Sequence, residues 1–384
     1  MVPKLRFKEF CGEWEEKRLG DVCKINPKNE SLPDTFNYID LENVVEGRLL
    51  KFNNTISKNN APSRAKRLLQ NNDILYQTVR PYQKNNFYFD IEETEIPYVA
   101  STGYSQLRTD KNNPKFIFQE IHTDIFVNNV LERCTGTSYP AINSSDLGNI
   151  RFTIPSLPEQ TKIADFLSTV DDKIQNQEDK ITHLENIKKG FMQKIFSRKI
   201  RFKDDSGEDF PEWEEKKIKD VFKITRGYVL SANNVEKNIN KEYIYPVYSS
   251  QTKDKGLLGY YNEYLYEDAI TWTTDGANAG TVHFRRGKFY CTNVCGVLIS
   301  ENGYANKCIA EMINRISKKY VSYVGNPKLM NNIMAEIKID LPCLKEQQKI
   351  SDILSLLDEK IDTDKETLEH LKQLKKGLLQ QMFA

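Results

Sequence analysis

The longest regular pattern of apolar positions in this chain is helical, and it occurs twice. In residues 156–197 and again in residues 342–384, apolar side chains recur at spacings that alternate between four and three. This spacing is typical of the seam of a coiled coil. We therefore predict two long helices that pair through the stripes formed by Ile163, Leu167, Val170, Ile174, Ile181 and Leu184 and by Ile350, Leu354, Leu357, Ile361, Leu368 and Leu371.

Polar residues interrupt both stripes at matching places. Gln177 and Asp364 occupy the seam, and a lysine follows at the same later position of each helix, at Lys188 and Lys375. Polar residues at a seam lower stability and fix the register of pairing. Because the interruptions match, we expect the two helices to pack antiparallel within one chain. Pairing with a helix of a second molecule is the alternative that would bury the same stripes. A helix of about 40 residues would be roughly 60 Å long.

The helical pattern is part of an internal repeat. Residues 157–196 align without a gap with residues 344–383, so that residue 157 matches residue 344, an offset of 187. Upstream, WEEKRLGDVCKI from Trp14 aligns with WEEKKIKDVFKI from Trp213, an offset of 199. The order of short motif, variable stretch and helical motif therefore occurs twice. The chain consists of two copies of one unit, each with a different middle.

The variable stretches contain short β-branched and aromatic runs separated by polar turns rich in Asn, Asp, Gly and Pro. Such runs predict strands, for example at Asp73–Tyr76 and Arg151–Ile154. We expect an α+β chain with two mixed α/β domains, two long antiparallel helices between them and an internal pseudo-two-fold repeat. The predicted boundaries are 1–155 for the first domain, 156–197 for the central helix, 198–341 for the second domain and 342–384 for the C-terminal helix.

Composition places the chain among soluble globular proteins. It has 384 residues, of which 39% are hydrophobic, and its net charge is +1 from 55 basic and 54 acidic residues. This balance excludes a polybasic tail but permits local basic patches. The seven cysteines contain no CxxC pair, and no apolar run reaches the ~18 residues of a membrane span. We expect a cytoplasmic protein with reduced cysteines, no metal site and no membrane contact.

The sequence contains no recognisable set of catalytic residues. It has no GxxxxGK[ST] phosphate loop, and the nearest approach to the tetrapeptide of adenine methyltransferases is Asn326–Leu329 (NPKL), which lacks the second proline and the aromatic residue. Gly276 and Gly280 follow a strand-like run but are not part of a dinucleotide fingerprint. A fused nuclease or methyltransferase, and a coiled-coil scaffold without a DNA role, are alternatives to a recognition protein.

Several polar loops carry the residue types that contact DNA. Bases are read mainly by Arg, Lys, Asn and Gln, and phosphates also accept hydroxyl donors. On this basis we predict DNA contacts in the first domain at Arg80, Tyr82, Gln83, Lys84, Thr137, Ser138 and Tyr139. In the second domain we predict them at Arg226, Tyr228, Ser250, Gln251, Lys253, Trp272, Thr273 and Lys328.

The chain resembles the specificity (S) subunits of Type I restriction–modification systems. The resemblance rests on the motif I/L-P-x-L-x-E-Q-x-K-I-x-D-x-L at Ile154–Leu167 and Leu341–Leu354, on the entry motifs at Trp14 and Trp213, and on the run from Gly136 to Ile142. It implies a non-catalytic subunit in which each domain is a target recognition domain for one half of a bipartite, asymmetric site in double-stranded DNA.

The same resemblance implies the partners. The two helices would set the distance between the recognition domains and dock two methyltransferase (modification) subunits, which bring S-adenosylmethionine and methylate adenine. Restriction subunits, the motor and nuclease of such systems, would add ATP and Mg. The chain itself would bind no cofactor.

Overall fold

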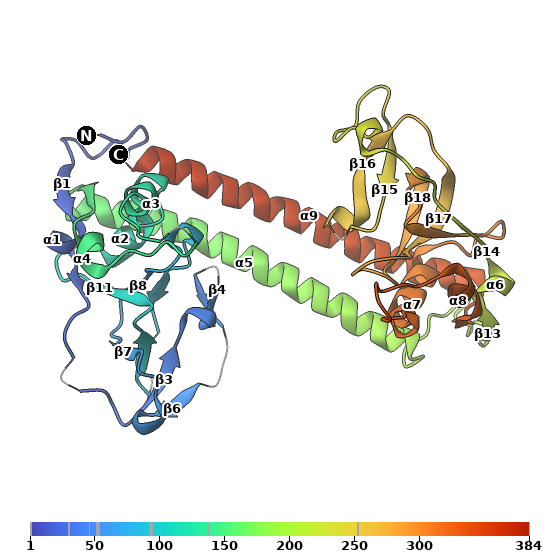
Figure 1. Ribbon diagram of the computed structural model, residues 1–384, viewed down its shortest axis with the longest axis horizontal. Coiled ribbons are helices and arrows are strands. Elements are labelled where there is room, and N and C mark those ends of the chain that lie inside the picture. Colours follow the sequence, from blue (N-terminus) through green and yellow to red (C-terminus); the bar gives the residue numbers. More distant parts are fainter. Residues whose placement is uncertain are drawn as a thin grey trace. The chain divides into compact units, whose positions relative to one another are not determined.

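The computed structural model describes residues 2–29, 31–45, 47–50, 54–91, 95–136, 138–251 and 253–383 (Figure 1). It confirms an α+β fold with two long helices, α5 (Leu157–Phe196) and α9 (Leu344–Met382). By contacts the chain forms two compact units: unit 1 is Met1–Asp179 with Glu366–Ala384, and unit 2 is Lys180–Lys365. Each unit therefore contains a part of both long helices. The rest of the unit, outside these helices, is called its sheet domain below. The predicted segments, in contrast, assign each long helix to a domain of its own.

The sheet domain of unit 1 contains two four-stranded sheets, with orders β2-β11-β8-β9 and β6-β3-β10-β7, and the pairs β1-β12 and β4-β5. The two runs predicted as strands lie in β8 and β12. Its strands are β1 Glu15–Arg18, β2 Lys24–Ile25, β3 Thr35–Ile39, β4 Val44–Val45, β5 Arg48–Leu49, β6 Thr55–Ser57, β7 Ala65–Leu68, β8 Asp73–Gln77, β9 Phe87–Phe89, β10 Tyr98–Ser101, β11 Tyr104–Arg108 and β12 Arg151–Ile154. Its helices are α1 Leu19–Val22, α2 Pro114–Glu120, α3 Asp124–Leu131 and α4 Ser144–Gly148.

The sheet domain of unit 2 contains one six-stranded sheet, with order β14-β19-β17-β18-β15-β16, and the pair β13-β20. Its strands are β13 Glu214–Lys217, β14 Lys223–Arg226, β15 Tyr245–Tyr248, β16 Leu257–Tyr261, β17 Tyr266–Thr273, β18 Val282–Cys291, β19 Cys295–Ile299 and β20 Lys338–Leu341. Its helices are α6 Ile218–Val221, α7 Lys307–Ser317 and α8 Asn331–Glu336.

The two sheet domains share a strand topology that their sequences do not reveal. In β2-β11-β8-β9 and in β14-β19-β17-β18, the first strand in the chain pairs with the last, and the two middle strands follow. Every pairing in both sets is antiparallel. The internal repeat therefore extends through the variable stretches at the level of the backbone.

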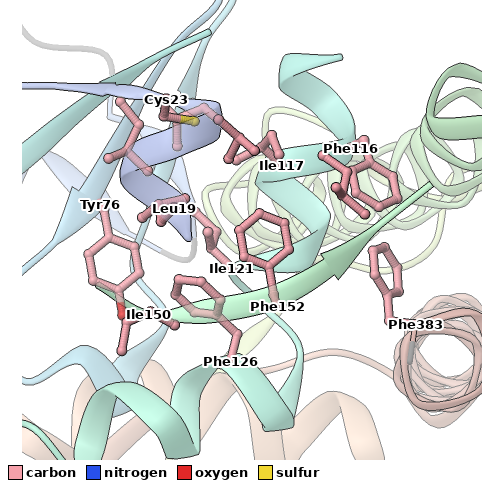
Figure 2. Packing of buried hydrophobic residues seen from close by; sticks show 14 of the residues in the cluster. Leu19, Cys23, Tyr76, Phe116, Ile117, Ile121, Phe126, Ile150, Phe152 and Phe383 are labelled. Atoms are coloured by element: carbon pink, nitrogen blue, oxygen red, sulfur yellow. The ribbon is translucent and has the colours of Figure 1, made fainter. Parts of the chain in front are cut away.

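The core of unit 1 is aromatic and includes both long helices. Phe126 and Phe152 lie edge to face at 6.2 Å, and Phe116 packs against Phe383 at 5.2 Å between ring centres (Figure 2). Ile163 and Leu167 of α5 are buried in the same cluster. The end of α9 also lies beside the N-terminal segment, where the Leu5 N–H donates to the Gln381 carbonyl at 2.8 Å (Figure 1).

Unit 2 repeats this arrangement with the two helices exchanged. Ile350 and Leu354, at the start of α9, join a buried cluster with Trp272 and with Ile195 near the end of α5. The first seam residues of each helix thus pack into a domain core, together with the end of the other helix. Farther along the seam Val170, Ile181 and Ile361 are buried. The remaining predicted seam residues are half-buried, namely Ile174, Leu184, Leu357, Leu368 and Leu371.

Charged side chains at the repeated polar positions join the helices in antiparallel order. In unit 1 the Lys375 ammonium lies 2.5 Å from the Asp171 carboxylate. In unit 2 Lys188 lies 2.6 Å from Asp358. The seam residue Asp364 is 4% exposed and accepts a hydrogen bond from Lys180 at 2.8 Å. The polar positions Asp364, Lys188 and Lys375 therefore form ion pairs between the two helices, and these pairs favour one register.

A buried glutamate connects the two repeated motifs in each unit. In unit 1 Glu159, in the first turn of α5, accepts hydrogen bonds from Arg6 at 2.7 and 2.8 Å and from the Trp14 indole at 3.4 Å. In unit 2 Glu346 accepts them from Arg201 at 3.3 and 3.0 Å and from the Trp213 indole at 2.9 Å. The two glutamates are 2% and 0% exposed. A buried carboxylate is stable only when it is paired, so these contacts fix the entry motif against the helix start.

Replacing Glu346 with glutamine should lower the free energy of unfolding of unit 2 by about 2–3 kcal/mol, because Arg201 loses a buried charged partner. Chemical denaturation measures this change. Glu214→Gln is the control, since Glu214 is exposed and its ion pair is with surface Lys216, and it should leave stability close to wild type. Equal effects of the two substitutions would contradict the role assigned to Glu346.

The stability of unit 2 should also depend on the ionisation of Asp358. Burial alone would raise the pKa of this carboxyl, but hydrogen bonds from Lys188 and Lys307 outweigh burial, so its pKa is lowered. The unfolded state therefore binds the proton more tightly, and this stabilisation is lost as the pH falls from about 4, the unfolded pKa, through the folded pKa. Urea unfolding should show that, over this acid range, the free energy of unfolding falls less in the Asp358→Asn variant than in the wild type. Parallel pH profiles would contradict the prediction.

Candidate nucleic-acid interface

Two loops that the sequence singles out in unit 1 lie together in the structure. Val79, after strand β8, forms a β-bridge with Ala141, which also bridges Thr135 across a short hairpin. The Arg80 N–H donates to the Pro140 carbonyl at 2.7 Å. The structure thus brings residues 76–86, which include Arg80, and residues 135–140, which include Tyr139, together at the end of strand β8.

Arg80 and Tyr139 form a stacked pair at this place. The guanidinium carbon of Arg80 lies 4.3 Å from the centre of the Tyr139 ring, and Tyr139 is 64% exposed. Arg80 has a φ of 53°, and Lys84 has a φ of 52°, so both residues that flank the 3₁₀ turn Pro81–Gln83 are left-handed. Non-glycine residues held in this conformation concentrate at functional sites. Stacking on a ring fixes the plane of the guanidinium, which is the geometry that bidentate recognition requires.

The other predicted residues of this loop differ in their exposure and in their hydrogen bonds to the rest of the domain. Tyr82 is 50% exposed, and the Gln83 side-chain oxygen accepts a hydrogen bond from the buried Gln77 at 3.0 Å. The Lys84 ammonium donates to the His122 carbonyl at 2.8 Å and to the Asp124 carboxylate at 2.7 Å. The structure therefore gives Lys84 a role inside the domain, where it holds the loop against α3. Ser138 is exposed beside Tyr139, whereas Thr137 lies outside the described residues.

His122, beneath this loop, is neutral at physiological pH. Burial lowers its pKa to about 4, although a hydrogen bond between its ring and the Phe118 carbonyl opposes the effect. The ring lies 3.3 Å from the Asn86 side-chain amide. The loop therefore rests on a neutral polar base, and its positive charge comes from Arg80 and Lys84.

Unit 2 contains the same hairpin at the offset of the long helices. Ser322 bridges Lys328, which bridges Asp275, and the Gly276 N–H donates to the Pro327 carbonyl at 3.0 Å. The bridging residues 135 and 141 of unit 1 thus correspond to 322 and 328 of unit 2, an offset of 187. Sequence reasoning did not assign Asp275, Tyr323 or Asn326 to this surface. Extending the helix alignment upstream places Tyr323 and Asn326 in the hairpin. It does not place Asp275, which bridges Lys328 as Val79 bridges Ala141 but lies at an offset of 196 from Val79.

The unit 2 hairpin presents different chemistry. At its tip Tyr323 is 68% exposed and Val324 is 93% exposed. The Asn326 amide donates to the Asp275 carboxylate, and the Lys328 ammonium lies 3.9 Å from the same carboxylate. Where unit 1 has a guanidinium stacked on a phenol, unit 2 has an amide, a carboxylate and an ammonium. The two units therefore offer unlike hydrogen-bonding patterns at equivalent positions.

Trp272 does not lie on this surface, which corrects the prediction of a DNA contact there. It is 1% exposed, and its indole N–H donates to the Leu329 carbonyl at 3.0 Å. The indole fills the space over Gly296, where an added Cβ would lie 2.1 Å from the ring. Thr273 is 7% exposed, and its N–H donates to the Thr281 carbonyl. The aromatic residue of this stretch serves packing.

The remaining predicted residues of unit 2 gather around the turn that follows β18. The Thr292 N–H donates to the Tyr248 carbonyl, and its hydroxyl bonds to Ser249 at 2.9 Å, next to Ser250. The Arg226 guanidinium donates to the Asn293 carbonyl at 2.6 Å, and the Tyr228 N–H donates to the Cys291 carbonyl. Tyr228 is 62% exposed, and Gln251 and Lys253 are also exposed.

This cluster is linked to the hairpin. The Asn278 amide, in the turn that begins at Asp275, donates to the Ser250 carbonyl at 3.0 Å. Arg285 lies beneath, 6% exposed, with its guanidinium 3.7 Å from the Tyr248 ring centre and bonded to the Thr271 hydroxyl. Burial lowers the pKa of Arg285. The structure therefore joins most predicted residues of unit 2 into one polar surface.

The described part of the chain holds no group of three or more His, Cys, Asp or Glu side chains placed to bind a metal. In the same residues, no helix combines the length and the apolar character that crossing a membrane requires.

Comparison with known proteins points to one family. Residues 12–186 and 211–373 each match the family model described as the Type I restriction modification DNA specificity domain. A Mycoplasma pneumoniae protein, provisionally named as the N-terminus of a type I specificity subunit, is 40% identical over 141 residues, which are 36% of this chain and 74% of that protein. The specificity subunit of the type I restriction enzyme MpnII from the same organism is 35% identical over 140 residues, which are 36% of this chain and 41% of that subunit.

The fold is also found in a solved structure. The crystal structure of the S subunit of a Type I restriction–modification system from M. genitalium matches with a TM-score of 0.69 at 19% identity. The match covers 100% of this chain and 99% of that one. The whole two-unit architecture, and not only one sheet domain, is therefore shared.

Proposed function

Because the chain belongs to the specificity subunits of Type I restriction–modification systems, which are non-catalytic, we propose that each of its units reads one half of a bipartite, asymmetric site in double-stranded DNA. The observation that supports this most directly is the pair of equivalent hairpins with unlike side chains. Equivalent positions imply the same task, and unlike hydrogen-bonding groups imply different bases.

In unit 1 Arg80 is the leading candidate for a base contact. A guanidinium whose plane is fixed can donate two hydrogen bonds to O6 and N7 of one guanine. Tyr82, Gln83, Ser138 and Tyr139 surround it and would supply further base or phosphate contacts. Lys84 contributes through the position of the loop.

In unit 2 Asp275 and the hairpin residues Asn326 and Lys328 would contact the second half-site. Asn pairs with adenine, and a carboxylate accepts from cytosine N4. Arg226, Tyr228, Ser250, Gln251 and Lys253 extend this surface, and Thr273 lies beneath it. The half-sites read by the two units would therefore differ in sequence.

We also propose that the long helices set the distance between the half-sites. A helix of about 40 residues is roughly 60 Å long, which approaches two turns of DNA at ~34 Å each. Linking two readers makes the second contact intramolecular, and affinity rises only when the half-site gap fits the linker.

The helices have matching features for two copies of a partner. Exposed apolar residues occur at equivalent positions: Leu157 and Leu344 are 49% and 43% exposed, and Ile187 and Leu374 are 43% and 54% exposed. We propose that two methyltransferase subunits with S-adenosylmethionine dock on the helices. Restriction subunits with ATP and Mg would complete the assembly.

Replacing Arg80 with alanine should relax specificity at one base of the first half-site and weaken binding by about 1–3 kcal/mol, because a bidentate base contact is lost. Sequencing of methylated adenines in cells that contain the chain and its modification partners reports the half-sites. Arg64→Ala, which removes an exposed positive charge elsewhere in unit 1, should leave both half-sites intact. A change in the second half-site caused by Arg80→Ala would contradict the assignment.

Lengthening both long helices by one turn, after Asp179 and after Lys365, should change the gap between the half-sites and leave the half-sites themselves unchanged. The same methylation map measures both quantities. Altered half-sites with an unchanged gap would show that the helices do not determine spacing.

A further inference from the structure

Two carboxylates, Asp171 on α5 and Asp358 on α9, each bind both the other long helix and a helix of the sheet domain. We propose that these junctions hold each recognition domain at a fixed angle on the helix pair, and that this angle determines how strictly the gap between half-sites is kept. The inference rests on the proposed reading of a bipartite site. It concerns positioning residues, since neither carboxylate lies among the candidate DNA contacts.

In the junction of unit 1 the Asp171 carboxylate makes one contact with the other long helix and one with the sheet domain. The Lys375 ammonium of α9 lies 2.5 Å from the Asp171 carboxylate, and the Gln119 amide of α2 donates to it at 2.7 Å. Gln119 is 2% exposed and the Asp171 side chain is 32% exposed, so their contact is partly buried. A hydrogen bond to a charged group in such surroundings is strong and directional.

The junction in unit 2 also joins an aspartate to a lysine of the other long helix and to a side chain of a domain helix. Lys188 of α5 lies 2.6 Å from the Asp358 carboxylate, and Lys307, the first residue of α7, lies 2.7 Å from it. Lys307 and Lys188 also approach Glu311 of α7, at 3.1 and 3.7 Å. Asp358 here corresponds to Asp171, and Lys188 to Lys375, each at the offset of 187. The two copies keep these charges, although their sheet domains contact them through different side chains.

A second attachment makes the junction sensitive to angle. The Gln160 side chain, in the first turn of α5, accepts from the N–H of Asn113, the N-cap of α2, at 2.9 Å. In unit 2 the Asn306 amide, at the N-cap of α7, donates to the Gln347 side chain at 2.7 Å. Gln160 and Asp171 are about 16 Å apart along the helix axis.

One contact would permit the domain helix to pivot, whereas contacts at separate points fix its direction. On α2 these points are Asn113 and Gln119. On α7 the adjacent residues Asn306 and Lys307 form one point, and Glu311, one turn farther along and 3.7 Å from Lys188, forms the second.

The junctions are connected to the candidate reading loops. In unit 1 α2 ends just before His122, whose carbonyl accepts the hydrogen bond of Lys84 at 2.8 Å. Lys84 closes the turn that begins at Arg80. In unit 2 the Lys255 ammonium, beside the loop of Gln251 and Lys253, lies 2.7 Å from Asp362, one helical turn after Asp358. A tilt of the domain helix would therefore move the side chains that face DNA.

The test separates the two arms of the unit 1 junction. Gln119→Leu keeps the side-chain volume but removes the hydrogen bond between Asp171 and the sheet domain. Lys375→Met removes the ion pair between Asp171 and the other long helix. With the chain and its modification partners in cells, sequencing of methylated adenines gives the distribution of gaps. For Gln119→Leu we expect methylation at gaps one base pair longer or shorter to rise about tenfold, equivalent to ~1.4 kcal/mol. Lys375→Met should lower the melting temperature and keep the wild-type gap.

Gln175→Leu is the matched control, because Gln175 lies one turn from Asp171 and its amide bonds within α5, to Asp179 at 2.7 Å. An unchanged gap distribution in Gln119→Leu would overturn the inference, as would equal broadening in all three variants. If Gln119→Leu does not fold, Lys307→Met provides the same test in unit 2. A wild-type map without a bipartite site would instead refute the proposed function.

Discussion

The structure depends on a buried carboxylate that must be paired. Glu159 and Glu346 each lie in the first turn of a long helix. Each accepts hydrogen bonds from an arginine in the segment before the entry motif and from the tryptophan of that motif. Desolvating a carboxylate is costly, so neither helix start is stable until all three segments have assembled. The repeated motifs are therefore explained by folding: they are the parts that close each unit, whatever sheet domain lies between them.

This arrangement separates what is constant from what varies. The entry motif and the helix start recur in both copies, as do the ion pairs Lys375–Asp171 and Lys188–Asp358, while the sheet domains keep only a strand topology and a hairpin. In unit 1 the hairpin presents Tyr139 beneath Arg80, and in unit 2 it presents Asn326 beside Asp275. A change of side chains at such loops alters what is bound without disturbing the residues that hold the unit together. Specificity and stability are thus assigned to different parts of the chain.

Sequence reasoning succeeded where the determining pattern is local. The periodicity and the gap-free repeat predict α5 and α9 within two residues of their observed ends. It failed where burial depends on distant strands: Trp272 lies in a strand-like run whose exposure the sequence does not show, and pairing of β17 with β18 and β19 encloses its indole over Gly296. For Lys84 the sequence likewise does not show the partners inside the domain, the His122 carbonyl and the Asp124 carboxylate. The run Gly325–Leu329 aligns with the end of the run Gly136–Ile142 but shares few of its side chains, so the sequence alone does not show that both runs form the same hairpin.

The order in which the segments lie along the chain has a consequence for biosynthesis. Unit 2 is continuous, from Lys180 to Lys365, whereas unit 1 consists of two pieces that flank it. The core of unit 1 includes Met382 and Phe383, so its packing stays incomplete while the ribosome adds more than half of the chain. During translation the second unit to be made can finish first. Until then the first sheet domain exposes apolar surface that can aggregate, and chaperones commonly bind such surfaces.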